Sequence, residues 1–274
     1  MSSYSVLMSV YKKERPEYLK LSVESMLNQT MQTDDFVLVC DGPLTQELDE
    51  VISSFQEAYP SIFQIVRLAE NVGLGPALNE GIRHCRNELV ARMDSDDYAP
   101  TSRCELQLRA FAQDPKLTIV SGAIQEFEGS PENVTASKIM PQTHEEIVRY
   151  AKLRSPFNHP AVMYRKSAVL DAGGYPDLPL HEDYALWANM LMNGAKGCNL
   201  PDVLCCMRVD SGLYGRRGGF RYYKTAVRFR LYLLKQGFCN LWEFFYGVTG
   251  LTVVCLVPTS LRKTLYKKLL RTKK

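Results

Sequence analysis

Short apolar runs alternate with amphipathic segments along the first half of the chain. The runs at 4–11, 35–40, 63–68 and 88–93 are rich in β-branched residues, which is typical of strands. Between them, residues 15–29, 45–59 and 75–86 repeat apolar positions every three or four residues, as helices with one buried face do. Pro16 suits the start of the first helix, and Thr45 suits the cap of the second. This alternation predicts an α/β fold with a Rossmann-like, mostly parallel central sheet and helices on both faces.

The second half of the chain has a less regular pattern. Thr143 and Glu146 form a capping-box signature at the start of one helix, and another helix is predicted from residue 182 to the glycine at 194. From about residue 208 the chain is again predicted to be helical. The apolar positions of this last segment that share one helical face are Tyr223, Val227, Leu231 and Leu234.

Composition indicates a large core and a reducing environment. The chain has 274 residues, 46% of them hydrophobic, which is enough to bury a substantial core. None of the eight cysteines forms a C-x-x-C pair, so we expect reduced, buried thiols and neither zinc ligands nor disulfides. No export signal opens the sequence, which favours a cytoplasmic protein. The longest apolar run, 241–257, is interrupted by Glu243 and two glycines and falls short of a membrane span.

The net charge of +3 conceals an uneven distribution. Residues 208–274 contain 15 Lys and Arg against only Asp210 and Glu243, a net charge of +13, so residues 1–207 carry −10. A basic, aromatic tail on an acidic body suggests that the tail meets an anionic partner. Nucleic acid and an anionic membrane surface are the two candidates.

Three carboxylates follow the fourth predicted strand within four residues: Asp94, Asp96 and Asp97. They repel one another, and no lysine or arginine lies among them. In an extended segment positions i and i+2 face the same way, so Asp94 and Asp96 can converge on one Mg²⁺ or Mn²⁺ ion that also binds a diphosphate. Because a short D-x-D motif is also common in solvated acidic turns, the pattern alone leaves both interpretations open.

Six segments in a particular order carry a family resemblance. They are "SVLMSVYKKERPEYLKLSVESMLNQT", "VLVCDGP", "NVGLGPALNEGI", "LVARMDSDDYAPTSR", "NHPAVMYRKSAVLDAGGY" and "HEDYALW". Together they resemble family 2 glycosyltransferases with the GT-A nucleotide-sugar-binding fold, of the bacterial type that builds exopolysaccharide and O-antigen repeat units, similar to amylovoran biosynthesis enzymes. The resemblance covers about residues 3–210. It implies a nucleotide-sugar-binding part (1–116) and an acceptor-binding part (117–210), followed by a basic amphipathic helical tail (211–274).

The resemblance also implies a set of donor-binding residues. Asp41 would hydrogen-bond the uracil of a UDP-sugar, although an Asp-Gly pair is also a common turn. Asp96 would be the main metal ligand, with Asp94 on the ribose or metal side and Asp97 supporting either role. The other donor contacts implied by the resemblance are Val10, Tyr11, Glu14, Asn71, Gly73 and Ser95.

A second acidic centre lies at the start of the helix predicted from residue 182. In similar enzymes the aspartate of this Glu-Asp pair is the catalytic base, so the resemblance makes Asp183 the expected base, with Glu182 and His181 as helpers. Transfer with inversion needs a base for the acceptor hydroxyl and a metal for the departing diphosphate. A carboxylate at a helix N-terminus can equally serve only the helix dipole. His159 and Trp187 are further candidates for the acceptor side.

The implied reaction is inverting and non-processive. Galactose or glucose would pass from a UDP-sugar to N-acetylglucosamine on diphosphoundecaprenol, in β-1,3 linkage, and the Q-x-x-R-W motif of processive members is absent. Two alternatives stay open. A non-catalytic nucleotide-sugar or nucleic-acid binding protein would need no base, and a nucleotidyltransferase would normally have a glycine-rich, basic loop after the first strand.

The basic tail fits a lipid-linked acceptor. Residues 258–274 place leucines on one stripe and basic residues on another, which is the layout of a helix lying in a membrane interface. We therefore expect peripheral binding to anionic lipid on the cytoplasmic face of the inner membrane. No nucleic-acid-binding motif occurs, so no nucleic-acid partner is expected. Arg216 and Arg217 are candidates for holding the acceptor phosphates.

Overall fold

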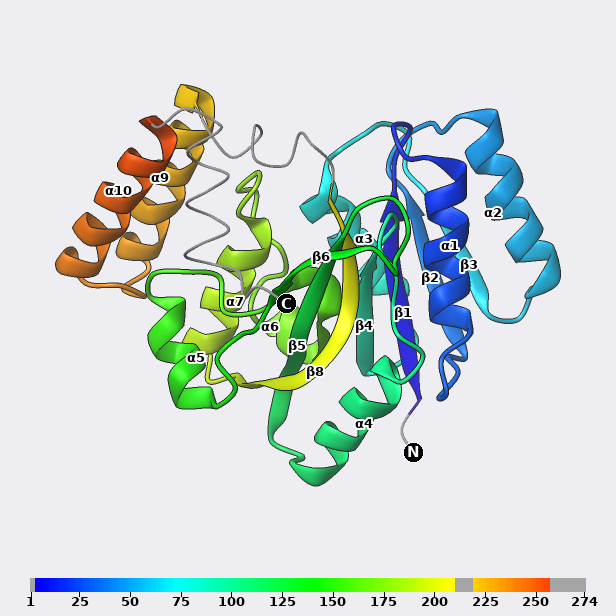
Figure 1. The fold of residues 1–274 in the computed structure, drawn as a ribbon, viewed down its shortest axis with the longest axis horizontal. Helices are drawn as coiled ribbons and strands as arrows, with labels where there is room; N and C mark the ends of the chain where they lie inside the picture. Colours follow the sequence, from blue (N-terminus) through cyan, green and yellow to red (C-terminus); the bar gives the residue numbers. More distant parts are fainter. Residues whose placement is uncertain (1–2, 210–218, 257–274) are drawn as a thin grey trace.

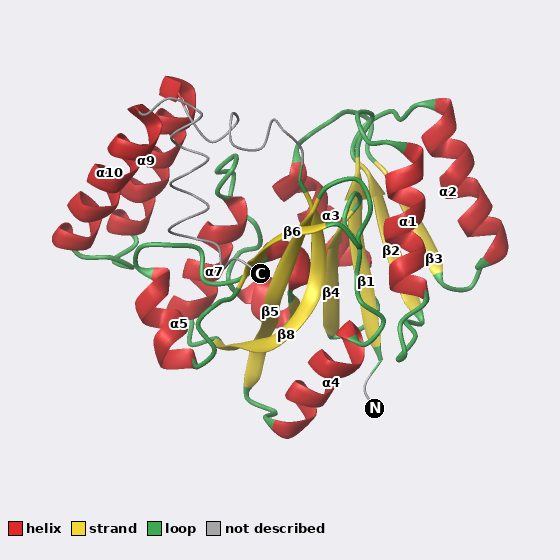
Figure 2. Cartoon of the chain, viewed as in Figure 1, coloured by secondary structure: helices red, strands yellow, loops and turns green. Residues whose placement is uncertain are grey.

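The computed structural model describes residues 3–209 and 219–256 (Figure 1). A central sheet lies between two layers of helices, and two C-terminal helices pack together at one side of this body (Figure 2). The α/β architecture predicted from the alternating pattern is therefore confirmed.

The first half follows the predicted alternation element by element. Its strands are β1 (Tyr4–Val10), β2 (Asp35–Cys40), β3 (Phe63–Arg67) and β4 (Leu89–Asp94), and its helices are α1 (Pro16–Leu27), α2 (Gln46–Ala58) and α3 (Leu74–His84). α1 begins at its proline, and the hydroxyl of Thr45 accepts a hydrogen bond from the backbone N–H of Leu48 at 3.4 Å. Both start signals seen in the sequence are confirmed.

The second half adds shorter elements and two long strands. In chain order they are α4 (Arg103–Gln113), β5 (Leu117–Phe127), β6 (Val134–Lys138), α5 (His144–Ala151), η1 (His159–Ala161), β7 (Met163–Arg165), α6 (Lys166–Asp171), α7 (Glu182–Met192), β8 (Lys196–Arg208), α9 (Gly219–Lys235) and α10 (Leu241–Leu256). The predicted capping box is present at the start of α5, where Thr143 and Glu146 each bond the backbone of the other. The helix predicted at 182 is α7.

The sheet is mostly parallel, as the sequence indicated. Its strand order is β3-β2-β1-β4-β7-β5-β6, and β8 also pairs with β5. β1 to β4 are parallel neighbours, while β7 is antiparallel to both β4 and β5. Because β8 is parallel to β5, the strands β1–β5 and β8 share one direction, against β6 and β7. The carboxyl ends of the six parallel strands therefore meet at one edge of the sheet.

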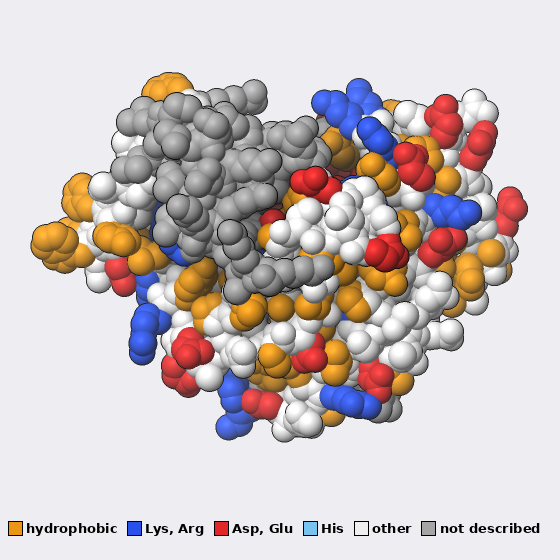
Figure 3. Space-filling view, viewed as in Figure 1, with side chains coloured by type: hydrophobic (Ala, Val, Ile, Leu, Met, Phe, Trp, Pro, Cys, Tyr) orange, Lys and Arg blue, Asp and Glu red, His pale blue; other side chains and the backbone are white. Residues whose placement is uncertain are grey.

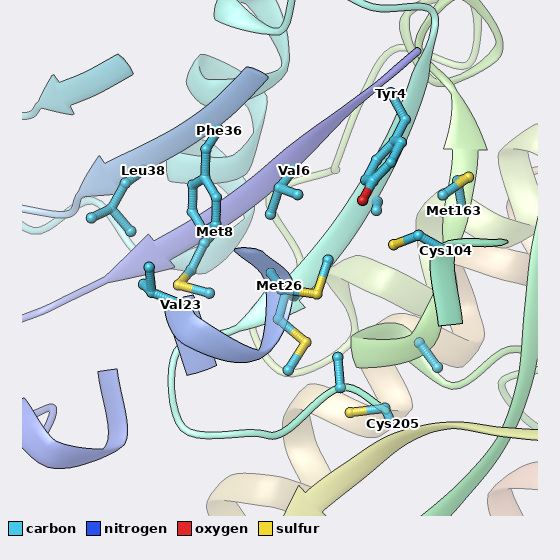
Figure 4. Close-up of a cluster of buried hydrophobic side chains, with 14 of the residues drawn as sticks. Tyr4, Val6, Met8, Val23, Met26, Phe36, Leu38, Cys104, Met163 and Cys205 are labelled. Atoms are coloured by element: carbon cyan, nitrogen blue, oxygen red, sulfur yellow. The ribbon is translucent and has the colours of Figure 1, made fainter. Parts of the chain in front are cut away.

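The two faces of the sheet carry separate hydrophobic clusters. Along β1, Tyr4, Val6 and Met8 point to one face, where they pack with residues of α1, α2 and α4 (Figure 4). Leu7 points to the opposite face, where the cluster includes residues of α3, α6 and α7. This alternation is the period of two that a strand imposes, and it confirms that helices cover both faces.

The helix predicted near residue 223 exists as α9, but of the four positions predicted to share one face only Leu234 packs against the cluster that joins α9 to the body. The apolar positions of α9 that are buried or in ring contact with the body are Tyr222, Ala226, Phe229 and Leu233, whereas Leu231 of the predicted set is 41% exposed. Tyr223 instead accepts a hydrogen bond from Thr252 of α10 at 3.1 Å. α9 thus has apolar contacts on two sides, and a single-stripe pattern could not tell which side meets the body.

Two further expectations can be compared with the structure. All eight cysteines are free and seven are buried, as expected for a reduced protein. In the described part of the chain, no helix has the length and apolar character needed to cross a bilayer, and α10 has 16 residues. The predicted amphipathic segment at 258–274 lies outside the described residues.

Candidate active site

A pocket of about 650 Å³ opens at the edge of the sheet where the parallel strands end. Ligands of open α/β sheets bind at this edge, because the loops there face a common crevice. Residues that line the pocket follow β1 (Tyr11, Lys13, Glu14, Arg15), β2 (Asp41), β3 (Asn71, Gly73), β4 (Asp94, Ser95, Asp96) and β8 (Arg208). The structure thus brings most of the predicted donor-binding residues together.

The loop after β3 is held by Asp41. One carboxylate oxygen accepts the backbone N–H of Val72 at 2.7 Å, and the other accepts the Asn71 amide at 2.8 Å and the backbone N–H of Gly73 at 3.1 Å. Gly73 adopts φ 91°, a conformation that favours glycine, immediately before α3. Asp41 therefore fixes the shape of one wall of the pocket, whether or not it also contacts a base.

The loop after β1 is tied to the acidic segment. Glu14 accepts a hydrogen bond from the Ser95 hydroxyl at 2.6 Å, and both line the pocket together with Tyr11, which is 44% exposed. Val10 was expected here as well, but it is 1% exposed and belongs to the core. Its side chain points into the sheet cluster because it is the last inward position of β1.

The three aspartates after β4 have different environments. Asp94 pairs with the buried guanidinium of Arg92. Burial, together with the charges of Asp94 and Glu14, raises the pKa of Asp96 to about 7. Asp97 is fully buried and accepts the backbone N–H of Arg208 at 2.8 Å, and burial raises its pKa well above the usual range. Of these three aspartates, only Asp94 and Asp96 line the pocket. Asp97 instead binds the backbone at the end of β8 and has a structural role.

Two arginines that the sequence interpretation missed face this acidic segment. Arg92 lies two residues before Asp94 and so shares its side of the strand, which the period of two could have indicated. Arg208, at the end of β8, donates to the carbonyl oxygen of Asp96 at 3.0 Å and lies 3.8 Å above the ring of Tyr18. No pattern in the sequence links position 208 with position 96, since the sheet alone brings them together.

The metal-ligating side chains of the pocket could hold a hard divalent cation only if a substrate supplied further ligands. Within the described residues, no three His, Cys, Asp or Glu side chains are grouped as a complete metal site. Two carboxylates, Asp94 and Asp96, face the same pocket, and Mg²⁺ or Mn²⁺ commonly takes one or two carboxylates with phosphate oxygens filling other positions. The residues present therefore suit a cation that arrives with a diphosphate.

The second acidic centre, Glu182 and Asp183, forms the first turn of α7. A Cβ placed on Gly75 would lie 3.3 Å from the Cβ of Glu182, so the starts of α3 and α7 are in close contact. Asn79 of α3 also accepts the backbone N–H of Tyr175 at 2.7 Å and donates to its carbonyl at 2.8 Å. Burial raises the pKa of Glu182. This centre thus adjoins the wall of the pocket formed by Gly73 and the start of α3.

The acceptor-side candidates are scattered. Trp187 is fully buried and packs edge-on against Phe157, so the prediction that it meets the acceptor was wrong: α7 turns this side chain toward the sheet. His159 bonds the Tyr175 hydroxyl at 3.0 Å, and burial lowers its pKa. His181 precedes Glu182 and stacks on Phe229. Arg216 and Arg217 lie outside the described residues.

Comparison with known proteins agrees with this geometry. The model of the family described as glycosyl transferase family 2 matches residues 5–173. The chain is 37% identical to UDP-Gal:alpha-D-GlcNAc-diphosphoundecaprenol beta-1,3-galactosyltransferase of Escherichia coli, over 98% of this chain and 96% of that one. It is 36% identical to amylovoran biosynthesis glycosyltransferase AmsE of Erwinia amylovora, over 97% and 98% of the two chains.

Two solved structures share the fold at low sequence identity. The mannosyltransferase PcManGT of Pyrobaculum calidifontis, in complex with GDP-Man and Mn²⁺, has a TM-score of 0.65 at 17% identity, over 98% of this chain and 76% of that one. TarS 1–349 of S. aureus, in complex with UDP-GlcNAc, has a TM-score of 0.61 at 18% identity, over 85% of this chain and 66% of that one. The GT-A fold is therefore confirmed.

Proposed function

Because this chain belongs to glycosyl transferase family 2, we propose that it transfers a hexose, galactose or glucose, from a UDP-sugar to a lipid-linked sugar acceptor. Full-length similarity to a galactosyltransferase that acts on a GlcNAc-diphosphoundecaprenol supports the finer proposal. In that form the donor is UDP-galactose and the product a β-1,3 linkage to N-acetylglucosamine, as in O-antigen or exopolysaccharide repeat units. Family membership favours this activity over a nucleotidyltransferase or a binding protein without catalysis.

On the donor side, the residues around the pocket hold the nucleotide. Tyr11 and Glu14 flank it after β1, and Asp41 holds the loop of Asn71 and Gly73 against it. Asp94 and Asp96 are the ligands available to Mn²⁺ or Mg²⁺, which when bound stabilises negative charge developing on the departing diphosphate. Arg208 adds a fixed positive charge to the same wall.

On the acceptor side, Asp183 is the proposed base. The observation that supports the proposal is the close approach of Glu182 to Gly75 at the start of α3, one residue after Leu74 of the pocket wall; Glu182 and Asp183 themselves do not line the pocket. Inversion requires one group to take the proton of the acceptor hydroxyl as its oxygen attacks the anomeric carbon. Glu182, the other carboxylate of the pair, remains a helper in this proposal, and burial raises its pKa.

We also propose that the protein binds peripherally to a membrane surface. α10 exposes Trp242 (86%), Tyr246 (71%), Leu241 (62%) and Phe245 (60%), and apolar side chains gather at the edge of the molecule where α10 lies (Figure 3). Aromatic rings favour the headgroup region of a bilayer. A lipid-linked acceptor would then be met at the surface in which it is anchored.

The test is a donor screen that measures UDP release with a synthetic GlcNAc-diphosphate-lipid acceptor. We expect acceptor-dependent release with UDP-galactose or UDP-glucose, and loss of release in Asp183→Asn with UDP-sugar binding retained. No acceptor-dependent release from any UDP-hexose would refute the proposed substrates. Undiminished turnover by Asp183→Asn would refute the proposed base.

A further inference from the structure

The chain leading into α7 has an unusual backbone. Leu180 has φ 71°, and among the described residues other than glycine it is the one with positive φ. Its side chain is 61% exposed, so burial of that side chain does not explain the conformation. Such a conformation persists where the surroundings fix it, and here the next three residues are His181, Glu182 and Asp183. The turn that contains it is closed by the backbone N–H of His181, which donates to the carbonyl oxygen of Leu178 at 2.9 Å, and the α7 start follows directly.

Rings of α9 pack on the residues that follow Leu180 in this turn. Phe229 stacks on His181 with ring centroids 4.8 Å apart and an interplanar angle of 13°. The same Phe229 ring lies 4.7 Å from that of Tyr184, and Tyr222, two turns earlier on α9, lies 5.8 Å from His181. Phe229 therefore contacts the residue before the Glu-Asp pair and the residue after it.

α9 is anchored to the body by other groups as well. Arg230 donates to the carbonyl oxygen of Lys152 at 2.9 Å and also to that of Leu153. The Tyr232 hydroxyl donates to the side chain of Asn189 in α7 at 2.8 Å. We therefore expect a change at Phe229 to leave α9 in place and to weaken mainly its contact with the start of α7.

We infer that Phe229 is a positioning residue for the base at Asp183, an inference that rests on the proposed function. A base works only within hydrogen-bond reach of the acceptor hydroxyl, and a misplacement of about 1 Å can lower the rate about a hundredfold. The two ring contacts fix the backbone on both sides of Asp183 and so set where its carboxylate points. Both α9 and the α7 start lie outside the segment matched by the family model, residues 5–173.

The experiment compares Phe229→Leu and Phe229→Ala with Leu233→Ala. Leu233 lies one turn further along α9, is fully buried in the same cluster, and has no ring to stack on His181. Each variant is checked for folding by circular dichroism and for UDP binding by calorimetry. We expect kcat of the Phe229 variants to fall roughly 10- to 100-fold with the KM for UDP-sugar changed by less than about twofold. Leu233→Ala should keep kcat below its melting temperature. Equal losses of kcat in all three variants would overturn the inference.

A double variant separates this inference from the proposed function. If Phe229 acts through Asp183, adding Phe229→Leu to Asp183→Asn should lower the residual rate by less than about twofold, because the interaction being positioned is already gone. Independent, multiplying losses would overturn the role of Phe229 while leaving Asp183 as the base. Full activity of Asp183→Asn alone would instead remove the proposed base.

Discussion

The pair Arg92–Asp94 makes the two carboxylates of the D-x-D segment unequal in their effect on stability. The Arg92 side chain is 1% exposed and that of Asp94 is 33% exposed, and they form an ion pair. The Nε and Nη1 atoms of Arg92 are buried with no hydrogen-bond partner in the described part of the chain. Removing Asp94 therefore strands a buried cation. Removing Asp96 instead eliminates a buried carboxylate that the charges of Asp94 and Glu14 repel.

The size of the difference follows from these surroundings. Breaking a buried ion pair by removing one partner costs about 3–5 kcal/mol, because the remaining charge is left uncompensated. The partial exposure of Asp94, and the repulsion from Asp96 and Asp97 that its loss relieves, offset part of this. We expect Asp94→Ala to lower the free energy of unfolding by about 2–3 kcal/mol and Asp96→Ala to change it by less than about 1 kcal/mol.

The assay is urea unfolding in the presence of a chelator, so that no metal contributes to either state. Circular dichroism gives the midpoint and slope for the wild type, Asp94→Ala, Asp96→Ala and the double variant Arg92→Met/Asp94→Ala. The double variant should recover most of the lost stability, because exchanging a whole buried pair for apolar groups is often neutral. Equal midpoints for the two aspartate variants, or no recovery in the double variant, would refute the reasoning.

Three further predictions concern activity and binding. Chelation of divalent cations should abolish sugar transfer, and Asp96→Ala should do the same while keeping its fold; full turnover in excess chelator would exclude a metal requirement. Asp183→Asn should lower turnover by about two to four orders of magnitude with little change in UDP-sugar affinity, whereas loss of affinity would indicate a donor-binding role. The protein should sediment with anionic vesicles at low salt and be partly released at high salt. Trp242→Ser combined with Phe245→Ser should weaken this binding, and Tyr59→Ser, which removes a 40% exposed ring at the end of α2, should not; failure of the wild type to bind would refute the membrane proposal.

Local signals predicted the scaffold well because they act within a few residues. Pro16 and Thr45 start their helices as expected, and the Thr143 capping box forms, since each needs only its own first turn. The same alternation predicts where β1, β2 and β4 end, and the family resemblance named Glu14, Asp41 and Asp96 as donor-site residues after these strands, all of which line the pocket. Contacts between residues that are distant in the sequence and meet only through the sheet could not be predicted from such local signals.

The positions of Trp187 and Arg208 could not be predicted from local sequence patterns. A tryptophan one helical turn after an acidic pair is equally compatible with a binding site and with a core. Only the orientation of α7 against the sheet places Trp187 in the core. Arg208 reaches the acidic segment because β8 ends beside it, and its backbone N–H and guanidinium contact Asp97 and Asp96. The pairing of β5 with β8 supplies that neighbourhood, and no local pattern encodes it.

The charge of the C-terminal region is where a count over the sequence misleads most. The +13 of residues 208–274 suggested one basic surface, yet Arg208 lines the pocket, and Arg230 is 5% exposed and bonds two carbonyl oxygens of the body. Arg230 is therefore an internal part of the fold and Arg208 faces the pocket, so neither adds to an outward basic surface. Outward, the described region offers the apolar side chains of α10 together with the exposed cations Lys224, Arg228 and Lys235 of α9, while the inner face of α9 carries Phe229 to the start of α7. The region is thus divided between support of the site and an exposed aromatic face, and a membrane assay tests only the second of these roles.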